Sequence, residues 1–217
     1  MNGFAQLRSF FITAVALAML VGNSSFAAIS SGGNTSANPT SPGADPIIGI
    51  NNIGRVTATQ GGQITSDVVI LGEQANGIGL VTITDYNAGT DQASTWTTNS
   101  LTVGKAGVGQ LEILNGAIVT VDFAGIPGTG DFVVGDAADA IGTVVVSGLG
   151  SMLRLGDDTV IAQLGTGTLR IADGGYVQGT NGATQDTDIF TVGLHGRLEL
   201  AGVDERLVCF LSGVGAR

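Results

Sequence analysis

Cysteine, histidine and basic residues are scarce in this chain of 217 residues. The single cysteine, Cys209, excludes an intramolecular disulfide, so the fold must be stabilised by the packing of the chain against itself. The single histidine, His195, has no cysteine, histidine or carboxylate cluster beside it in the sequence. This excludes a zinc site and a nucleophilic triad, and predicts an exposed turn residue. Eight Lys and Arg against 18 Asp and Glu give a net charge of −10 without basic clusters, which excludes a nucleic-acid partner.

Aromatic residues and nucleotide-binding motifs are equally sparse. Trp96 is the only tryptophan, and the two tyrosines, Tyr86 and Tyr176, are out of step with any repeat. A stacking row for sugars is therefore not expected, and Trp96 is predicted to be a packing residue at a corner. No glycine-rich stretch has the spacing of a phosphate-binding loop, which excludes nucleotide cofactors.

Close carboxylates occur as Asp157-Asp158 and as the pair Asp136 and Asp139. They fit either a calcium site or the acid–base pair of a polysaccharide-cleaving enzyme. They equally fit turns, because an Asp side chain bonds its own local backbone. We adopt the turn interpretation, so the sequence predicts no catalytic, cofactor-binding or metal-binding residue and no enzymatic activity.

The N-terminal residues 1–27 have the features of a secretory signal peptide. Arg8 precedes an apolar stretch of about 12 residues, and small residues at Ser25 and Ala27 suit cleavage after Ala27. A transmembrane anchor is the alternative, but a bilayer span needs roughly 20 apolar residues. No second run of spanning length follows, so we expect an exported chain without an integral membrane span.

Residues 28–53 are rich in Ser, Gly, Asn and Pro and lack periodicity, which predicts a flexible linker. Beyond it, one short pattern recurs: Gly, any residue, Val or Leu, any residue, an apolar residue. The copies begin at Gly54, Gly79, Gly109, Gly142, Gly167 and Gly196, at spacings of 25, 30, 33, 25 and 29 residues. Such periods indicate a solenoid, a propeller or an array.

Within each copy the third and fifth residues are apolar and their neighbours mostly polar, which predicts a strand with one buried face. We expect the repeat glycine and the turn pairs Asn115-Gly116 and Asp173-Gly174 to supply positive φ angles. The inward set is predicted to be Val81, Ile83, Leu111, Ile113, Val144, Val146, Leu169, Ile171, Leu198 and Leu200, and the outward set Glu112, Arg170 and Glu199.

Two further strands are predicted in each period. One follows the turn, and the other ends in Gly before the next copy, at Leu71-Gly72, Val103-Gly104, Val134-Gly135, Leu164-Gly165 and Val192-Gly193. Three short strands per period predict an all-β, single-stranded parallel β-helix (β-solenoid) of about six coils over residues 54–205. A propeller blade needs a longer period of about 40–50 residues, and a sandwich does not predict one recurring motif.

The repeat also resembles a known family. The resemblance covers about residues 54–202. It is carried by residues 101–119, 142–151 and 164–177 and by the Ser94-Thr95-Trp96 corner, whereas Gly150-Ser151 is followed by Met152 rather than by the family's Thr-Trp. The family is the bacterial repeat associated with type V secretion (autotransporter) passengers and PEP-CTERM exoproteins. It implies an exported β-helical passenger with an adhesive or structural role, although residues 206–217 match neither a translocator barrel nor a sorting tail.

These observations predict a secreted or cell-surface repeat protein, with a carbohydrate-active β-helix (a polysaccharide lyase or hydrolase) as the alternative. Surface glycans, matrix, or self-association through open solenoid ends are the expected partners. Residues 206–217 read as a diverged tail that leaves the last coil uncapped, and Cys209 as a small buried apolar residue.

Overall fold

The computed structural model describes residues 28–35, 45–121, 131–179, 190–202 and 206–208. The chain is all-β with parallel sheets, as the sequence predicts at this level. Residues 1–27, Cys209 and most of the predicted C-terminal tail lie outside the described residues. None of the described residues forms a helix that is long and apolar enough to cross a membrane.

Three sheets contain almost all of the strands. Sheet A has the order β1 (Ala28–Gly33), β3 (Ile53–Thr59), β6 (Ile78–Thr84), β11 (Val108–Leu114), β14 (Ile141–Ser147), β17 (Thr166–Ala172), β20 (Gly196–Ala201). Sheet B has the order β2 (Ile47–Ile48), β5 (Val68–Leu71), β10 (Ser100–Val103), β13 (Phe132–Val134), β16 (Thr159–Ile161), β19 (Phe190–Val192). Sheet C has the order β4 (Gln63–Thr65), β9 (Thr95–Thr98), β12 (Ile118–Val121), β15 (Met152–Leu155), β18 (Tyr176–Gly179), β21 (Arg206–Val208).

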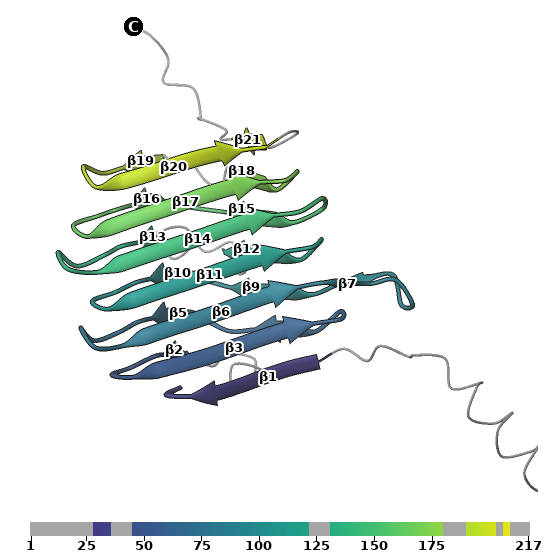
Figure 1. Ribbon diagram of the computed structural model, residues 1–217, viewed down its shortest axis with the longest axis horizontal. Coiled ribbons are helices and arrows are strands. Elements are labelled where there is room, and N and C mark those ends of the chain that lie inside the picture. Colours follow the sequence, from purple (N-terminus) through teal and green to yellow (C-terminus); the bar gives the residue numbers. More distant parts are fainter. Residues whose placement is uncertain (1–27, 36–44, 122–130, 180–189, 203–205, 209–217) are drawn as a thin grey trace, which may run out of the picture.

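The chain contributes strands to the three sheets in a fixed order. It passes from sheet B to sheet A to sheet C, as in β10, β11 and β12, and then returns to sheet B at β13. In Figure 1 the sheet A strands form a stack in chain order, and only β1 points the opposite way. A small hairpin of β7 (Tyr86–Asn87) and β8 (Gln92–Ala93) projects from the stack between β6 and β9.

The pairing register follows the repeat. Each repeat glycine lies opposite the glycine of the next copy, so that Gly79 pairs with Gly54 on one side and with Gly109 on the other. This register places the alternating apolar residues in columns on one face of sheet A. The predicted inward residues of four copies are at most 1% exposed: Val81, Ile83, Leu111, Ile113, Val144, Val146, Leu169 and Ile171.

The prediction of an inward, buried side chain is wrong for two residues. Leu198 and Leu200 pair in register with Leu169 and Ile171, but they are 36% and 59% exposed. They belong to the last described strand of sheet A, and no later described strand covers them. The three predicted outward residues lie on the other face: Arg170 is exposed, and Glu112 and Glu199 are half-buried.

The range predicted as a linker contains strands. Residues Ala28–Gly33 form β1 and Ile47–Ile48 form β2, so the expectation of an unstructured segment is wrong for these residues. The reason is tertiary structure, because backbone hydrogen bonds pair β1 with β3 and β2 with β5. At the other end, Arg206–Val208 of the predicted diverged tail form β21, which continues sheet C.

Candidate functional site

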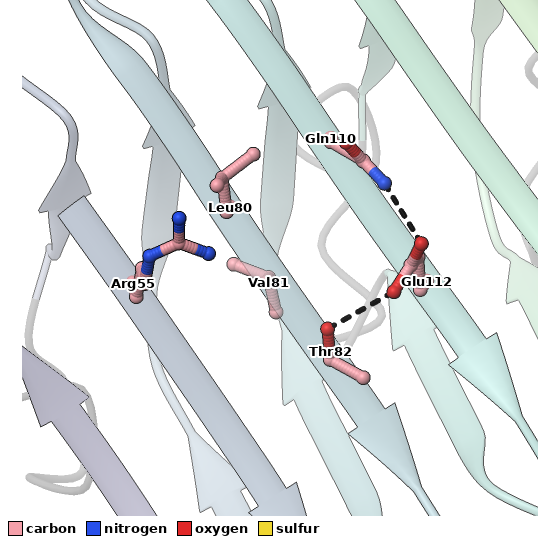
Figure 2. A pocket seen from close by; sticks show the side chains of 6 residues that line it. All are labelled: Arg55, Leu80, Val81, Thr82, Gln110 and Glu112. Atoms are coloured by element: carbon pink, nitrogen blue, oxygen red, sulfur yellow. Dashed lines mark hydrogen bonds between the residues drawn. The ribbon is translucent and has the colours of Figure 1, made fainter. Parts of the chain in front are cut away.

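A hollow on the outer face of sheet A is the clearest candidate for a binding site. It is lined by residues of three adjacent strands, β3, β6 and β11 (Figure 2): Arg55, Leu80, Val81, Thr82, Gln110 and Glu112. Side chains alternate across a strand, so Arg55, Thr82 and Glu112 point to solvent while Val81 lies on the buried side. In the register of the sheet, Leu80 lies between Arg55 and Gln110, and the short Thr82 lies between Thr57 and Glu112.

The two charged side chains of this hollow differ in their hydrogen bonding. The Glu112 carboxylate accepts hydrogen bonds from Gln110 Nε2 at 2.8 Å and from Thr82 Oγ1 at 3.2 Å. Arg55 is exposed, and it has no ion pair or side-chain hydrogen bond with any residue in the described ranges. Figure 2 shows its guanidinium directed toward Leu80 and Val81, with the side chains of β6 between it and Glu112. The hollow therefore offers five N–H donors and a carboxylate to a polar ligand.

The structure adds a third carboxylate to one of the two predicted aspartate pairs. Asp131 and Asp157-Asp158 lie on neighbouring passes, where the chain turns from sheet C into sheet B, and Phe132 N donates to Asp158 O at 2.9 Å. Partial burial raises the pKa of the Asp131 carboxyl, and the negative charges of Asp157 and Asp158 raise it further. Sequence reasoning missed Asp131, because 26 residues separate it from Asp157.

The pair Asp136 and Asp139 lies at a different corner, where the chain turns from sheet B into sheet A. Asp136 N donates to Gly104 O at 2.9 Å, and its carbonyl accepts from Leu164 N at 3.0 Å. These backbone bonds join the corner at Asp136 to the corresponding corners one repeat before and one repeat after it. In the described part of the chain, no group of three or more His, Cys, Asp or Glu is arranged so that it could hold a metal ion.

The aromatic residues and the histidine are well separated. Trp96 is fully buried in β9 rather than at a corner, and its Nε1 donates to Ser66 Oγ at 2.8 Å, so its ring is closed to a sugar. Tyr86 is 44% exposed on the projecting hairpin, where its hydroxyl bonds to Asp91. Tyr176 is half-buried on sheet C. His195 is an exposed turn residue, as predicted.

A ladder of polar side chains follows the corner between sheets A and C. Asn115 Nδ2 donates to Thr84 Oγ1 at 3.2 Å and to Asp85 Oδ1 at 3.4 Å, and Ser147 Oγ donates to Asp173 Oδ2 at 2.9 Å. The predicted turn pairs are confirmed here, since Asn115 and Gly116 have φ angles of 54° and 86°. These side chains are hydrogen-bond partners of one another, so the ladder stabilises the turns.

The chain has no match among known proteins that would assign these residues a role. Comparisons with protein-family models, with curated proteins and with solved structures each found no match. The residues described above are therefore the basis on which a function is proposed.

Proposed function

We propose that this chain is an exported protein of the bacterial cell surface, with a structural or adhesive role, built as a single-stranded parallel β-helix of about six coils. The coil arrangement is supported by the strand order, since each sheet takes one strand from every repeat in chain order. The parallel registers support it as well, because β6, β11, β14 and β17 of sheet A each pair with the strands one repeat before and after them.

The observation that carries the adhesive role is the polar outer face of sheet A. Polar side chains occupy most positions of two outward columns of sheet A, with Leu80 and Val145 as the exceptions: Arg55, Gln110, Thr143, Thr168 and Arg197 in one, and Thr57, Thr82, Glu112, Arg170 and Glu199 in the other. In the hollow, Arg55, which pairs with no described residue, lies across from the Glu112 carboxylate. A row of fixed hydrogen-bonding groups on a rigid sheet suits a polymer that carries many hydroxyl or carboxylate groups, because weak contacts add along the chain. We therefore take surface or matrix polysaccharide as the ligand class.

Binding to a panel of acidic and neutral polysaccharides tests this proposal. Arg55→Ala should weaken binding several-fold, because it removes a charge-assisted contact worth about 1–2 kcal/mol. Arg154→Ala is the matched control, since Arg154 is an exposed arginine on the outer face of sheet C. Equal binding by the native chain and by both variants would contradict a site at the hollow.

One observation favours a second function, that of a carbohydrate-active enzyme. The raised pKa of Asp131 beside Asp157 and Asp158 is an arrangement that general acids use in glycoside cleavage. Incubation with the same polysaccharides distinguishes the two functions. Product release above that of a boiled sample, abolished by Asp131→Asn, would establish the enzyme and overturn a purely adhesive role.

A further inference from the structure

The two ends of the stack are covered differently. At the first end, β1 pairs antiparallel with β3 along all six residues of β1. Asn34 extends this cover, because its N–H donates to Ile53 O at 2.8 Å and its carbonyl accepts from Gly49 N at 2.7 Å. The edge of β3 is therefore occupied and closed to another strand.

At the other end, β20 pairs with β17 on one side only, and no strand in the described ranges pairs with its second edge. The apolar side chains there are exposed, with Leu198 at 36%, Leu200 at 59% and Val192 of β19 at 43%. Their counterparts one repeat earlier are fully buried. An unpaired edge backed by apolar side chains is a template for a further strand.

We propose that β20 is the interface through which two copies of this chain join tail to tail, their β20 strands forming an antiparallel pair about a twofold axis. A twofold interface brings the same strand from both copies together, and the two strands then run antiparallel. Head-to-tail growth would instead have to use the outer edge of β1, which runs antiparallel to the other strands of sheet A. Its exposed residues Ser30 to Gly32 offer no apolar side chain to cover Leu198 and Leu200. This inference rests on the coil arrangement of the proposed function and not on export or glycan binding.

The charges on β20 select one register for this pair. Apolar residues must stay on the buried face, so only registers that shift by two residues are compatible with the core. With Leu198 opposite the second copy's Leu198, Arg197 lies opposite the second copy's Glu199, and the symmetry repeats this pair. The next registers place Glu199 opposite Glu199, or Arg197 opposite Arg197, and like charges directly opposite one another are destabilising.

The same two side chains are already held on this face. Arg197 Nε lies 2.6 Å from Glu199 Oε1, and Arg170 Nε lies 3.8 Å from Glu199 Oε2. Glu199 is half-buried and Arg197 is exposed. Both charges therefore already lie together on the outer face, and Arg197, whose side chain is 73% exposed, is accessible to the Glu199 of a second copy.

Sedimentation velocity of the full chain, over a wide concentration range, tests the proposal. We expect a monomer–dimer equilibrium with no larger species. Arg197→Glu and Glu199→Arg should each weaken the dimer by about tenfold or more, because each sets like charges opposite one another twice. An equimolar mixture of the two variants should dimerise again, since every reversed position then faces an opposite charge.

The matched control is Arg154→Glu, the same charge change at an exposed position of β15 in sheet C, and it should leave the dimer unchanged. The register is tested by Leu198→Cys combined with Cys209→Ser. Residues directly opposite in an antiparallel pair have Cα atoms about 4.5–5.5 Å apart, within the range that a disulfide spans, so oxidation should give a covalent dimer. Leu200→Cys in the same background should not, because four residues separate position 200 from its opposite.

Three results would overturn the proposal. A full chain that stays monomeric at every concentration would mean that its own residues cover β20. Growth beyond the dimer would indicate head-to-tail assembly. Failure of the mixed variants to restore dimers would reject the register and its charge pairs. Each of these results leaves the polysaccharide-binding experiment of the proposed function untouched, so the two failures are distinguishable.

Discussion

At the scale of single residues, the repeat glycine is required by close packing of the backbone. A Cβ on Gly109 would lie 2.1 Å from the Gly104 nitrogen, and one on Gly79 would lie 2.2 Å from the Ile48 carbonyl oxygen. The expectation that this glycine supplies a positive φ is wrong, because the positive φ angles fall on the preceding corner, at Gly72 and Gly104. The chain folds back so tightly at this corner that a side chain at the repeat glycine would collide with backbone atoms.

Gly109→Ala should therefore destabilise the chain by about 2–3 kcal/mol, the cost of overpacking a site whose neighbours are backbone atoms and cannot move aside. The measurement is the free energy of unfolding from urea denaturation. Gly32→Ala is the control, since no atom lies within 4 Å of a Cβ built there, and it should be neutral. Equal effects of the two substitutions would contradict the steric role of the repeat glycine.

The Asp131 carboxyl predicts a pH dependence of stability. Its pKa is raised above the ordinary 3.8 by burial and by Asp157 and Asp158, so the folded chain holds this proton more tightly than the unfolded chain. The group supports the fold below pH 3.8, and this support is lost as the pH rises through the raised pKa.

Asp131→Asn should accordingly be more stable than the native chain at pH 7 and lose this advantage at pH 3, as measured by urea denaturation at both values. Asp139→Asn, at an exposed turn position, serves as the control. An Asp131→Asn variant that is less stable than the native chain at pH 7 would show that the carboxylate makes a favourable contact instead.

One corner residue shows where a sequence pattern is insufficient. Sheet B strands were expected to end in Gly, and Gly72, Gly104 and Gly135 do occupy this position, but in the fifth pass the position belongs to Ala162, with a φ of 63°. The sequence predicts Leu164-Gly165 at this position, whereas Leu164 lies between β16 and β17 and is 67% exposed. An alanine forced into a left-handed conformation by its neighbours leaves no signal in the sequence.

At the scale of elements, β1 is the feature that sequence reasoning missed most clearly. Its residues, Ala-Ile-Ser-Ser-Gly-Gly, have weak strand propensity, and Ser30 to Gly32 are exposed. They form a strand because the edge of β3 offers unpaired backbone groups, and only the tertiary context reveals this edge. The repeat strands were predictable because apolar and polar residues alternate along them, and this alternation indicates which face of each strand is buried.

Removal of β1 tests its capping role. A chain that lacks residues 28–35 exposes the edge of β3, while β20 keeps an edge with which no described strand pairs. We expect concentration-dependent growth into species larger than dimers, measured by light scattering, because head-to-tail pairing is then no longer blocked. Ser30→Ala with Ser31→Ala retains the backbone and should behave as the native chain does. A deletion variant that sediments as the native chain does would argue against the cap.

At the scale of the whole molecule, the sequence predicts the repeat and its inward-facing residues. It does not predict which residues from distant parts of the sequence lie close together. Asp131 meets Asp157, and Arg55 shares a hollow with Glu112, only because successive passes stack in register. These residues are too far apart in the sequence for any local motif to connect them. The exposure of Leu198 likewise follows from its position at the end of the stack, although its strand has the same pattern as the others.

The last prediction joins export to this architecture. Cleavage after Ala27 would make Ala28 the first residue of the exported chain, and Ala28 is also the first residue of β1. The exported chain would then retain the whole cap, because the pairing with β3 begins at Ala28 opposite Thr59. Mass spectrometry of the product from a Gram-negative host should give a chain that begins at Ala28 or Ile29.

Ala27→Arg, which removes the small residue that signal peptidase needs, should leave the precursor uncleaved and associated with the membrane through its apolar stretch. Recovery of the native product with Met1 still attached would contradict export through a cleaved signal. Cleavage well inside β1 would be equally informative, because it would give an exported chain with an open β3 edge. That chain should assemble as the β1 deletion does, so the N-terminus of the exported product determines which ends of the stack are free to associate.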